Sequence, residues 1–295
     1  MSIGEAIVNG MVQGLTEFLP VSSSGHLGLL QYFTGRGAET GLFFTILLHL
    51  GTLLAVFLAF WKTISGLIAE VFLLLGELVR GRFRLANPTP RRKMLYLLFV
   101  SLLPMALSFF LLDVFTAVST DNDIVLEGAC FLLTSLLLFL CANNGNGRKK
   151  AASMSYQDAL VIGGMQALAP MPGISRSGST VAVGMLAGLD REFAIAFSFI
   201  MGVPTVLGAN ILEIADAVQS GEGLAVSVPV LLVGVVASLL FGLLAIRLVR
   251  WLAASDKFRW FAWYTLVLGV VTVLVGIVEH IAGHPLQQWV STLVR

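Results

Sequence analysis

Six apolar runs, each close to 20 residues long, constrain this chain more than any other feature of its sequence. They fall at residues 42–61, 94–113, 124–142, 191–216, 226–250 and 261–283. A helix needs about 20 apolar residues to cross a bilayer, so each run predicts one membrane-spanning helix. Only 12% of the 295 residues are charged, against roughly 25% in soluble domains. The composition excludes a soluble globular protein and indicates an all-α polytopic membrane protein.

Three further apolar stretches, at 3–19, 22–34 and 158–189, are too short or too interrupted by Pro, Gly, Ser and ionisable residues to cross alone. Irregular backbone survives at membrane depth only where protein or a wet cavity satisfies its polar groups. We therefore expect pairs of short re-entrant helices. The first stretch has no basic segment before it, so we expect it to belong to the mature protein rather than to a cleaved signal peptide.

Charged residues predict the orientation in the membrane. Lys and Arg gather at 80–93, 148–150 and 247–259, and the positive-inside rule makes these loops cytoplasmic. The alternate loops carry the acidic residues Asp113, Asp121, Asp123, Glu213, Asp216 and Glu222, and are expected to be external. This trace places both termini outside and leaves 64–80 as an interfacial helix on the cytoplasmic side. The balance of 18 Lys and Arg against 17 Asp and Glu gives no indication of a nucleic-acid partner.

An internal repeat relates the two halves of the chain at a shift of 153 residues. Val21–His26 matches Ile174–Ser179, and the same shift pairs Gln13 with Gln166, Phe44 with Phe197, Thr45 with Ser198 and Thr52 with Thr205. The alternative is a chance likeness between apolar helices rich in Leu, Gly and Ser. Three expected spans separate the first broken segment from the second, and an odd number reverses the direction of entry. The copies, 1–147 and 148–295, are therefore predicted to have inverted topology within one membrane domain. Discontinuous helices of inverted repeats meet near the midplane, which is where we expect the site.

The first broken segment gathers polar groups immediately before a helix. Gln13 and Glu17 are four residues apart and share a helix face, and Pro20 then forces a turn. Ser22–Ser24 and Gly25 follow, and they present hydroxyl and N–H groups at a helix N-terminus, a favourable place for phosphate. His26 lies one turn further on. The alternative interpretation is that the serines only cap a helix.

The second broken segment, Pro172–Thr180, places Arg176 among the hydroxyls of residues 175, 177, 179 and 180. A guanidinium is always charged and its planar fork suits phosphate oxygens. Burying it without an anionic partner is costly. The alternative is a structural ion pair with Glu17 of the other copy. His49 is interpreted as a core histidine rather than a ligand, and Thr45, Ser198 and Thr205 as cavity-lining residues or residues bonded to their own helix.

At these residues the sequence resembles the undecaprenyl-diphosphate phosphatase family, also called the bacitracin-resistance family. Its (E/Q)xxxE and PVSS-x-GH motifs are present from Gln13 to His26, and its PG-x-SRS-x-x-T motif spans Pro172–Thr180. The resemblance covers nearly the whole chain. It implies six spans plus re-entrant helices in an inverted repeat, in the bacterial inner membrane. It also implies hydrolysis of the C55 polyprenyl diphosphate to the monophosphate and phosphate, which recycles the cell-wall lipid carrier and confers bacitracin resistance, at a site open to the outer face.

The resemblance also implies site residues and a divalent cation, Mg²⁺ or Ca²⁺, held by Glu17. The residues expected to be catalytic are Glu17, Ser23, His26 and Arg176. The residues expected to bind substrate are Gln13, Ser22, Gly25, Gly173, Ser175, Ser177 and Thr180. Two positions depart from the family pattern, because Gln13 and Thr45 stand where other members carry acids. The carboxylate, the guanidinium and the His26 imidazole are expected to enclose one pyrophosphate.

Several alternatives stay open at this stage. His26 would attack phosphorus, activate water or protonate the leaving monophosphate, and Ser23 is a further candidate nucleophile. The alternative function is an inverted-repeat transporter or flippase for a phosphorylated polyprenyl lipid, because such repeats are common in transporters. A titratable pair, Glu17 and His26, favours catalysis. The sequence leaves the oligomeric state open.

Overall fold

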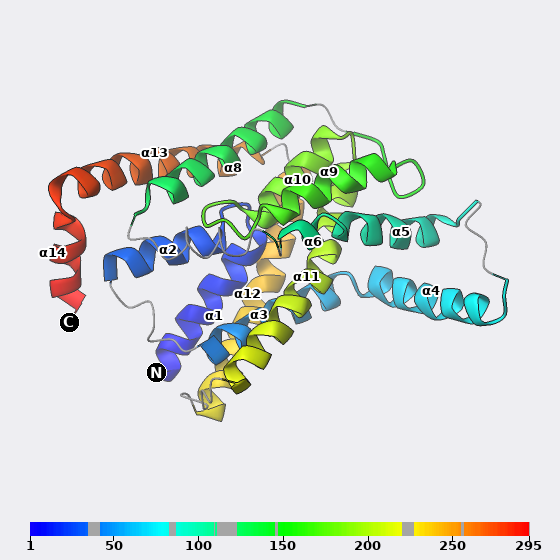
Figure 1. Cartoon of the computed structure of the whole chain (residues 1–295), viewed down its shortest axis with the longest axis horizontal. Helices are drawn as coiled ribbons and strands as arrows, with labels where there is room; N and C mark the ends of the chain where they lie inside the picture. The colour runs from blue at the N-terminus through cyan, green and yellow to red at the C-terminus, as the bar shows by residue number, and fades with distance from the viewer. Residues whose placement is uncertain are drawn as a thin grey trace.

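The computed structural model describes residues 1–34, 42–82, 87–108, 110, 123–144, 147–219, 227–254 and 257–294. The regular elements of these residues are helices, and an isolated bridge joins Lys149 to Leu189. Figure 1 shows their arrangement. The helices are α1 (Ile3–Phe18), α2 (Ser23–Thr34), α3 (Leu42–Ala59), α4 (Trp61–Val79), α5 (Pro90–Leu102), α6 (Met105–Ser108), α8 (Val125–Asn143), α9 (Tyr156–Ala167), α10 (Arg176–Leu186), α11 (Arg191–Gln219), α12 (Val228–Ala254), α13 (Arg259–Ala282) and α14 (Pro285–Val294).

The predicted all-helical membrane protein is confirmed. Among the described residues four helices, α8, α11, α12 and α13, are long and apolar enough to cross a membrane, and the bent pair α3–α4 raises the number to five. The expected span at 94–113 contains α5 and α6, which are separated at Leu103 and Pro104, and its last residues lie outside the described part. The count of six spans therefore stays a prediction. Asp113, Asp121 and Glu222 also lie outside the described residues.

The helix expected at 64–80 is present as α4, which turns by 90° from α3 at Phe60. One face of α4 is buried, whereas Phe72 and Val79 are 69% and 88% exposed, as suits contact with lipid. Arg92 of α5 binds two carboxylates of α4, of which Glu70 is on the buried face, donating to Glu70 at 2.6 Å and to Glu77 at 2.8 and 2.9 Å. These ion pairs hold α4 and α5 together as the arm at the right of Figure 1.

The two broken segments form helix pairs, α1–α2 and α9–α10, whose members have 16, 12, 12 and 11 residues. Both pairs begin with a capping box, at Ser2 with Glu5 and at Ser155 with Asp158, which are 153 residues apart. Each first helix then packs closely through a glycine at the same shift. A Cβ at Gly10 would lie 2.5 Å from the carbonyl oxygen of Gly234 in α12, and one at Gly163 would lie 2.0 Å from that of Ser101 in α5. These features agree with the repeat, while the inverted orientation of its copies stays a prediction.

The turns of the two pairs contact each other in the middle of the molecule. A Cβ at Gly25 would lie 2.7 Å from Gly173 Cα, and a Cβ at Gly178 would lie 2.7 Å from Pro20 Cβ. The Ser177 hydroxyl donates to the Leu19 carbonyl at 3.3 Å. Thr134 of α8 fixes the second turn, because its hydroxyl donates to the Gly173 carbonyl at 3.2 Å and accepts from the Ser175 N–H at 3.1 Å. The fold thus brings together two segments that lie far apart in the sequence.

Candidate active site

A cavity of about 250 Å³ lies where the two turns meet. The first half of the chain lines it with Thr16, Glu17, Ser22, Ser23, Ser24, His49 and Met105. The second half lines it with Gln166, Ala169, Pro170, Ile174, Ser175, Arg176, Ser177, Thr205, Val206, Ala209 and Asn210. Six of the residues expected at the site from the sequence therefore share one hollow.

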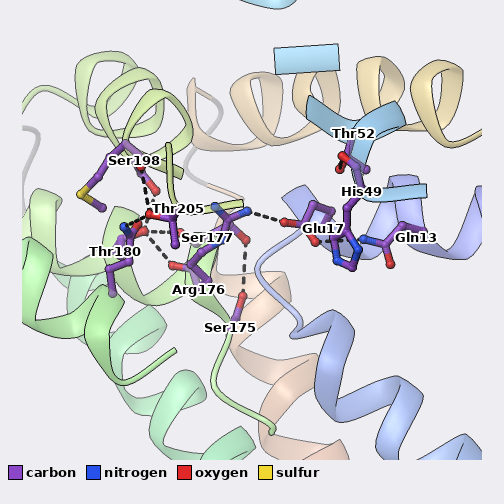
Figure 2. Close-up of polar contacts among 12 residues, drawn as sticks. Gln13, Glu17, His49, Thr52, Ser175, Arg176, Ser177, Thr180, Ser198 and Thr205 are labelled. Atoms are coloured by element: carbon purple, nitrogen blue, oxygen red, sulfur yellow. Dashed lines mark hydrogen bonds and ion pairs between the residues drawn. The ribbon is translucent and has the colours of Figure 1, made fainter. Parts of the chain in front are cut away.

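Arg176 and Glu17 form an ion pair across the two halves (Figure 2). Arg176 Nη2 donates to Glu17 Oε1, and Gln13 Nε2 donates to Glu17 Oε2 at 3.1 Å. The Glu17 and Arg176 side chains are 9% and 21% exposed. The ion pair considered as the structural alternative is thus present, but it lies in the cavity wall. The guanidinium has five N–H donors, and those not bound to Glu17 are suited to phosphate oxygens.

The Arg176 guanidinium occupies the space that a side chain at position 202 of α11 would fill, and this position is a glycine. A Cβ at this position would lie 1.9 Å from Arg176 Nη1 and 3.0 Å from its Cζ. The side chain of Arg176 therefore lies directly against the α11 backbone, and its other terminal nitrogen binds Glu17.

Two helix N-termini present their serines to the same cavity. The Ser22 hydroxyl accepts from the Gly25 N–H at 3.2 Å at the start of α2, and the Ser175 hydroxyl accepts from the Gly178 N–H at 3.1 Å at the start of α10. Ser22 adopts a left-handed backbone with φ of 68°, a strained conformation for a residue with a side chain. Helix N-termini carry partial positive charge and attract anions. The hollow therefore combines one guanidinium with two such termini.

His26 lies outside this lining. Its Nδ1 is 2.7 Å from the Ser22 carbonyl oxygen, and its Nε2 is 2.7 Å from the Tyr264 hydroxyl. The ring stacks on Tyr264 and meets Phe131 edge-on. The structure thus does not bring the imidazole into the hollow with Glu17 and Arg176, contrary to the expected enclosure by all three groups. The physical reason is that α8 and α13 supply aromatic partners on the other side of the turn. A catalytic role for His26 stays a prediction.

The remaining predicted residues support the cavity rather than line it. Thr180 is buried behind Arg176, where its hydroxyl donates to the Arg176 carbonyl at 2.7 Å and lies 2.5 Å from Ser198 Oγ. Gln13 contacts Glu17, and Gly25 and Gly173 form the close contact between the turns. Their roles in substrate binding stay predictions.

Sequence reasoning missed Thr16, the neighbour of Glu17, and three polar residues of the wall that come from other helices. His49, interpreted as a core residue, lines the cavity with its Nδ1 3.0 Å from the Thr45 carbonyl. Gln166 and Asn210 are 1% and 3% exposed and also line it. Of these three, only Gln166 could have been found from the sequence, because it matches Gln13 in the repeat. The positions of His49 and Asn210 depend on packing between helices that are distant in the sequence.

The cavity offers few ligands for a divalent cation. Within the described residues no three His, Cys, Asp or Glu side chains are grouped to hold a metal. Glu17 provides the carboxylate of the cavity lining. The buried Oε1 of Gln166 has no hydrogen-bond partner among the described residues. Mg²⁺ commonly binds through one or two carboxylates together with substrate phosphates. The residues therefore fit a cation that is held jointly by Glu17 and a bound diphosphate.

A second cavity, of about 510 Å³, lies at the other end of α11 and is lined by Lys62, Lys150, Glu192 and Arg250 among others. It is larger but contains no residue of either turn, and Arg250 is paired with Glu192. The smaller cavity is the one that unites the predicted residues.

Comparison with known proteins agrees with the resemblance in the motifs. The family model of the bacitracin resistance protein BacA matches residues 6–271. An undecaprenyl-diphosphatase of Methanosphaera stadtmanae is 37% identical over 282 residues, covering 94% of this chain and 99% of the relative. One of Alkaliphilus metalliredigens is 37% identical over 278 residues, with 94% and 100% covered. An undecaprenyl-diphosphatase 4 of Bacillus thuringiensis is 36% identical over 270 residues, with 91% and 95% covered.

Proposed function

The chain belongs to the bacitracin resistance protein BacA family, and from this membership we propose that it is a membrane phosphatase that hydrolyses undecaprenyl diphosphate to the monophosphate and inorganic phosphate. The observation that carries the proposal is the Arg176–Glu17 pair in a cavity with two serine-capped helix N-termini. Phosphoryl transfer needs mainly positioning and positive charge around the phosphate oxygens. This arrangement supplies both.

Each half of the chain contributes to binding the diphosphate head. Arg176 neutralises phosphate oxygens, and Ser22, Ser23, Ser175 and Ser177 orient them with hydroxyl and N–H groups. Gln13 fixes the Glu17 carboxylate from the other side. A divalent cation bound by Glu17 and the diphosphate would supply further positive charge for the departing phosphate.

Two roles remain alternatives within the proposal. Ser23 lines the cavity and is placed to act as a nucleophile, whereas His26, which is bonded to the Ser22 carbonyl and to Tyr264, would have to turn into the cavity to act. Trapping of a ³²P-labelled phosphoenzyme distinguishes these routes, because label on Ser23 contradicts attack by histidine and the absence of label indicates attack by water.

The protein is a multi-pass membrane protein, and we infer a site open to the outer face of the inner membrane. The cavity is lined by Val206, Ala209 and Asn210 on the C-terminal part of α11, towards the loop predicted to be external. The lysines of the second cavity lie at the opposite end. Both observations support access from outside, with the polyprenyl tail passing between helices into the lipid.

Release of inorganic phosphate from undecaprenyl diphosphate in the presence of Mg²⁺ tests this function. The purified wild-type protein should release phosphate, and Arg176→Ala should abolish release because it removes the guanidinium from the cavity. Arg80→Ala is the matched control, since Arg80 is an exposed residue at the end of α4 and should leave activity unchanged. A wild-type protein that binds the lipid without releasing phosphate would instead support the transporter, which the named relatives do not favour.

A further inference from the structure

Gln166 lines the cavity and carries a side-chain oxygen that has no hydrogen-bond partner among the described residues. Its side chain is 1% exposed, and its Nε2 donates to Thr205 Oγ1 at 2.8 Å. The Thr205 hydroxyl in turn donates to the Met201 carbonyl at 3.4 Å. Because the Thr205 hydroxyl donates its proton to Met201, it accepts from the amide nitrogen of Gln166. The amide oxygen, Oε1, is therefore the atom without a hydrogen-bond partner in the described part of the chain.

The matching glutamine in the first half is used differently. Gln13 donates to the carboxylate of Glu17, whereas the position equivalent to Glu17 at the shift of 153 is Pro170. Gln166 therefore has no acid to hold. Buried amide groups are normally satisfied by protein or by water, so the free oxygen indicates a ligand in the cavity.

The surroundings favour an O–H donor over a cation as that ligand. Thr205 lies three residues after Gly202 on α11, which places it about one turn away on a similar face. Arg176 Nη1 lies against Gly202, where a Cβ would be 1.9 Å from it. The guanidinium does not oppose a neutral water molecule there, whereas the divalent cation proposed above would be held by Glu17 together with the negatively charged diphosphate.

We propose that Gln166 orients the water that hydrolyses the diphosphate, and this inference rests on the proposed phosphatase function. The water oxygen forms a bond to the terminal phosphorus, while the bond from that phosphorus to the bridging oxygen breaks and leaves its electron pair on the polyprenyl monophosphate. One water proton stays on the attacking oxygen, and the other passes to an oxygen of the same phosphate. Gln166 Oε1 accepts a hydrogen bond from the water and takes no proton. Thr205 is a positioning residue that keeps the amide in this orientation.

The test compares kcat and KM of Gln166→Leu with the wild type. Leu keeps the volume but removes the acceptor, so kcat should fall about 10²-fold, the loss expected for a misplaced reacting group, while KM changes little. Thr205→Val should lower kcat in the same direction, and Thr205→Ser should restore it because the hydroxyl returns. Gln288→Leu, an exposed glutamine of α14, is the matched control with expected wild-type kinetics.

A binding readout separates this inference from the proposed function. The Kd of a non-hydrolysable methylene diphosphonate analogue of the lipid should be unchanged in Gln166→Leu, and the variant should keep its melting temperature in detergent. If the wild type releases phosphate while Gln166→Leu keeps its kcat, or loses activity only through weaker analogue binding or unfolding, Gln166 does not orient the water. If the wild type releases no phosphate, the phosphatase proposal itself fails.

Discussion

Arg176 and Glu17 are separated by 159 residues in the sequence yet form the charged centre of the molecule. Isolated burial of either charge is unfavourable, so each is retained only with its partner or with a ligand. The pair therefore holds the guanidinium ready for phosphate while the cavity is empty of substrate. The sequence offered this contact as the structural alternative to phosphate binding, because a buried arginine requires an anion.

Replacement of Arg176 by Lys tests what the guanidinium contributes beyond its charge. Lys retains the positive charge but loses the planar fork that binds two phosphate oxygens, so we expect kcat/KM for phosphate release to fall about 10²-fold, the usual effect of losing one oriented donor. Steady-state kinetics measure this. Activity of Arg176→Lys within about threefold of the wild type would mean that charge alone suffices.

The histidines show where residue-level prediction ends. His26 lies beside the serines in sequence, but Tyr264 and Phe131 hold its ring outside the cavity, and His49, in an apolar run, lines it. Local sequence gives the position of a side chain along a helix. Which side of the helix faces the cavity depends here on α8, α11 and α13, whose packing the sequence motifs do not encode.

At the scale of elements, two short helix pairs are held together by reciprocal close contacts of their turns. Gly25 packs against Gly173, and Gly178 packs against Pro20. The sequence predicted both pairs and their breaks, since Pro, Gly and Ser interrupt the apolar runs there. The close approach itself, which needs glycine at both positions, is visible only in the structure.

Gly178→Ala tests this contact, because the new Cβ would lie 2.7 Å from Pro20 Cβ and 3.0 Å from its Cα. Such overpacking should destabilise the protein by about 1–3 kcal/mol, and it should lower phosphate release by separating Arg176 from Glu17. Thermal unfolding in detergent measures the first effect. Gly208→Ala is the control, since a Cβ there meets nothing within 4 Å; equal stability of the two variants would contradict the contact.

At the scale of the whole molecule, apolar runs predicted the helical membrane fold and basic loops predicted its orientation. The two termini lie on the same side of the structure, away from the α4–α5 arm (Figure 1), while their external position stays a prediction. The bend at Phe60 divides one long apolar segment into α3 and α4, so run length alone does not determine how many segments cross the membrane.

Labelling of single cysteines in intact cells tests the orientation. Each variant is built on a background in which the buried Cys130 and Cys141 are replaced by Ala. A membrane-impermeant maleimide should react with Gln288→Cys near the C-terminus and should reach Arg80→Cys only after permeabilisation, because the basic loops are expected to be cytoplasmic. The reverse labelling pattern would mean that the cavity opens towards the cytoplasm, and it would contradict the predicted orientation.

The central claim is that the two turns together bind one diphosphate head. An experimental structure with the non-hydrolysable methylene diphosphonate analogue of undecaprenyl diphosphate measures this most directly. We expect both phosphorus atoms in the cavity between the turns, with phosphate oxygens in hydrogen-bond contact with Arg176 and with serines of both halves. A head group bound instead among Lys62, Lys150 and Arg250 of the second cavity, or held by one turn alone, would contradict the account.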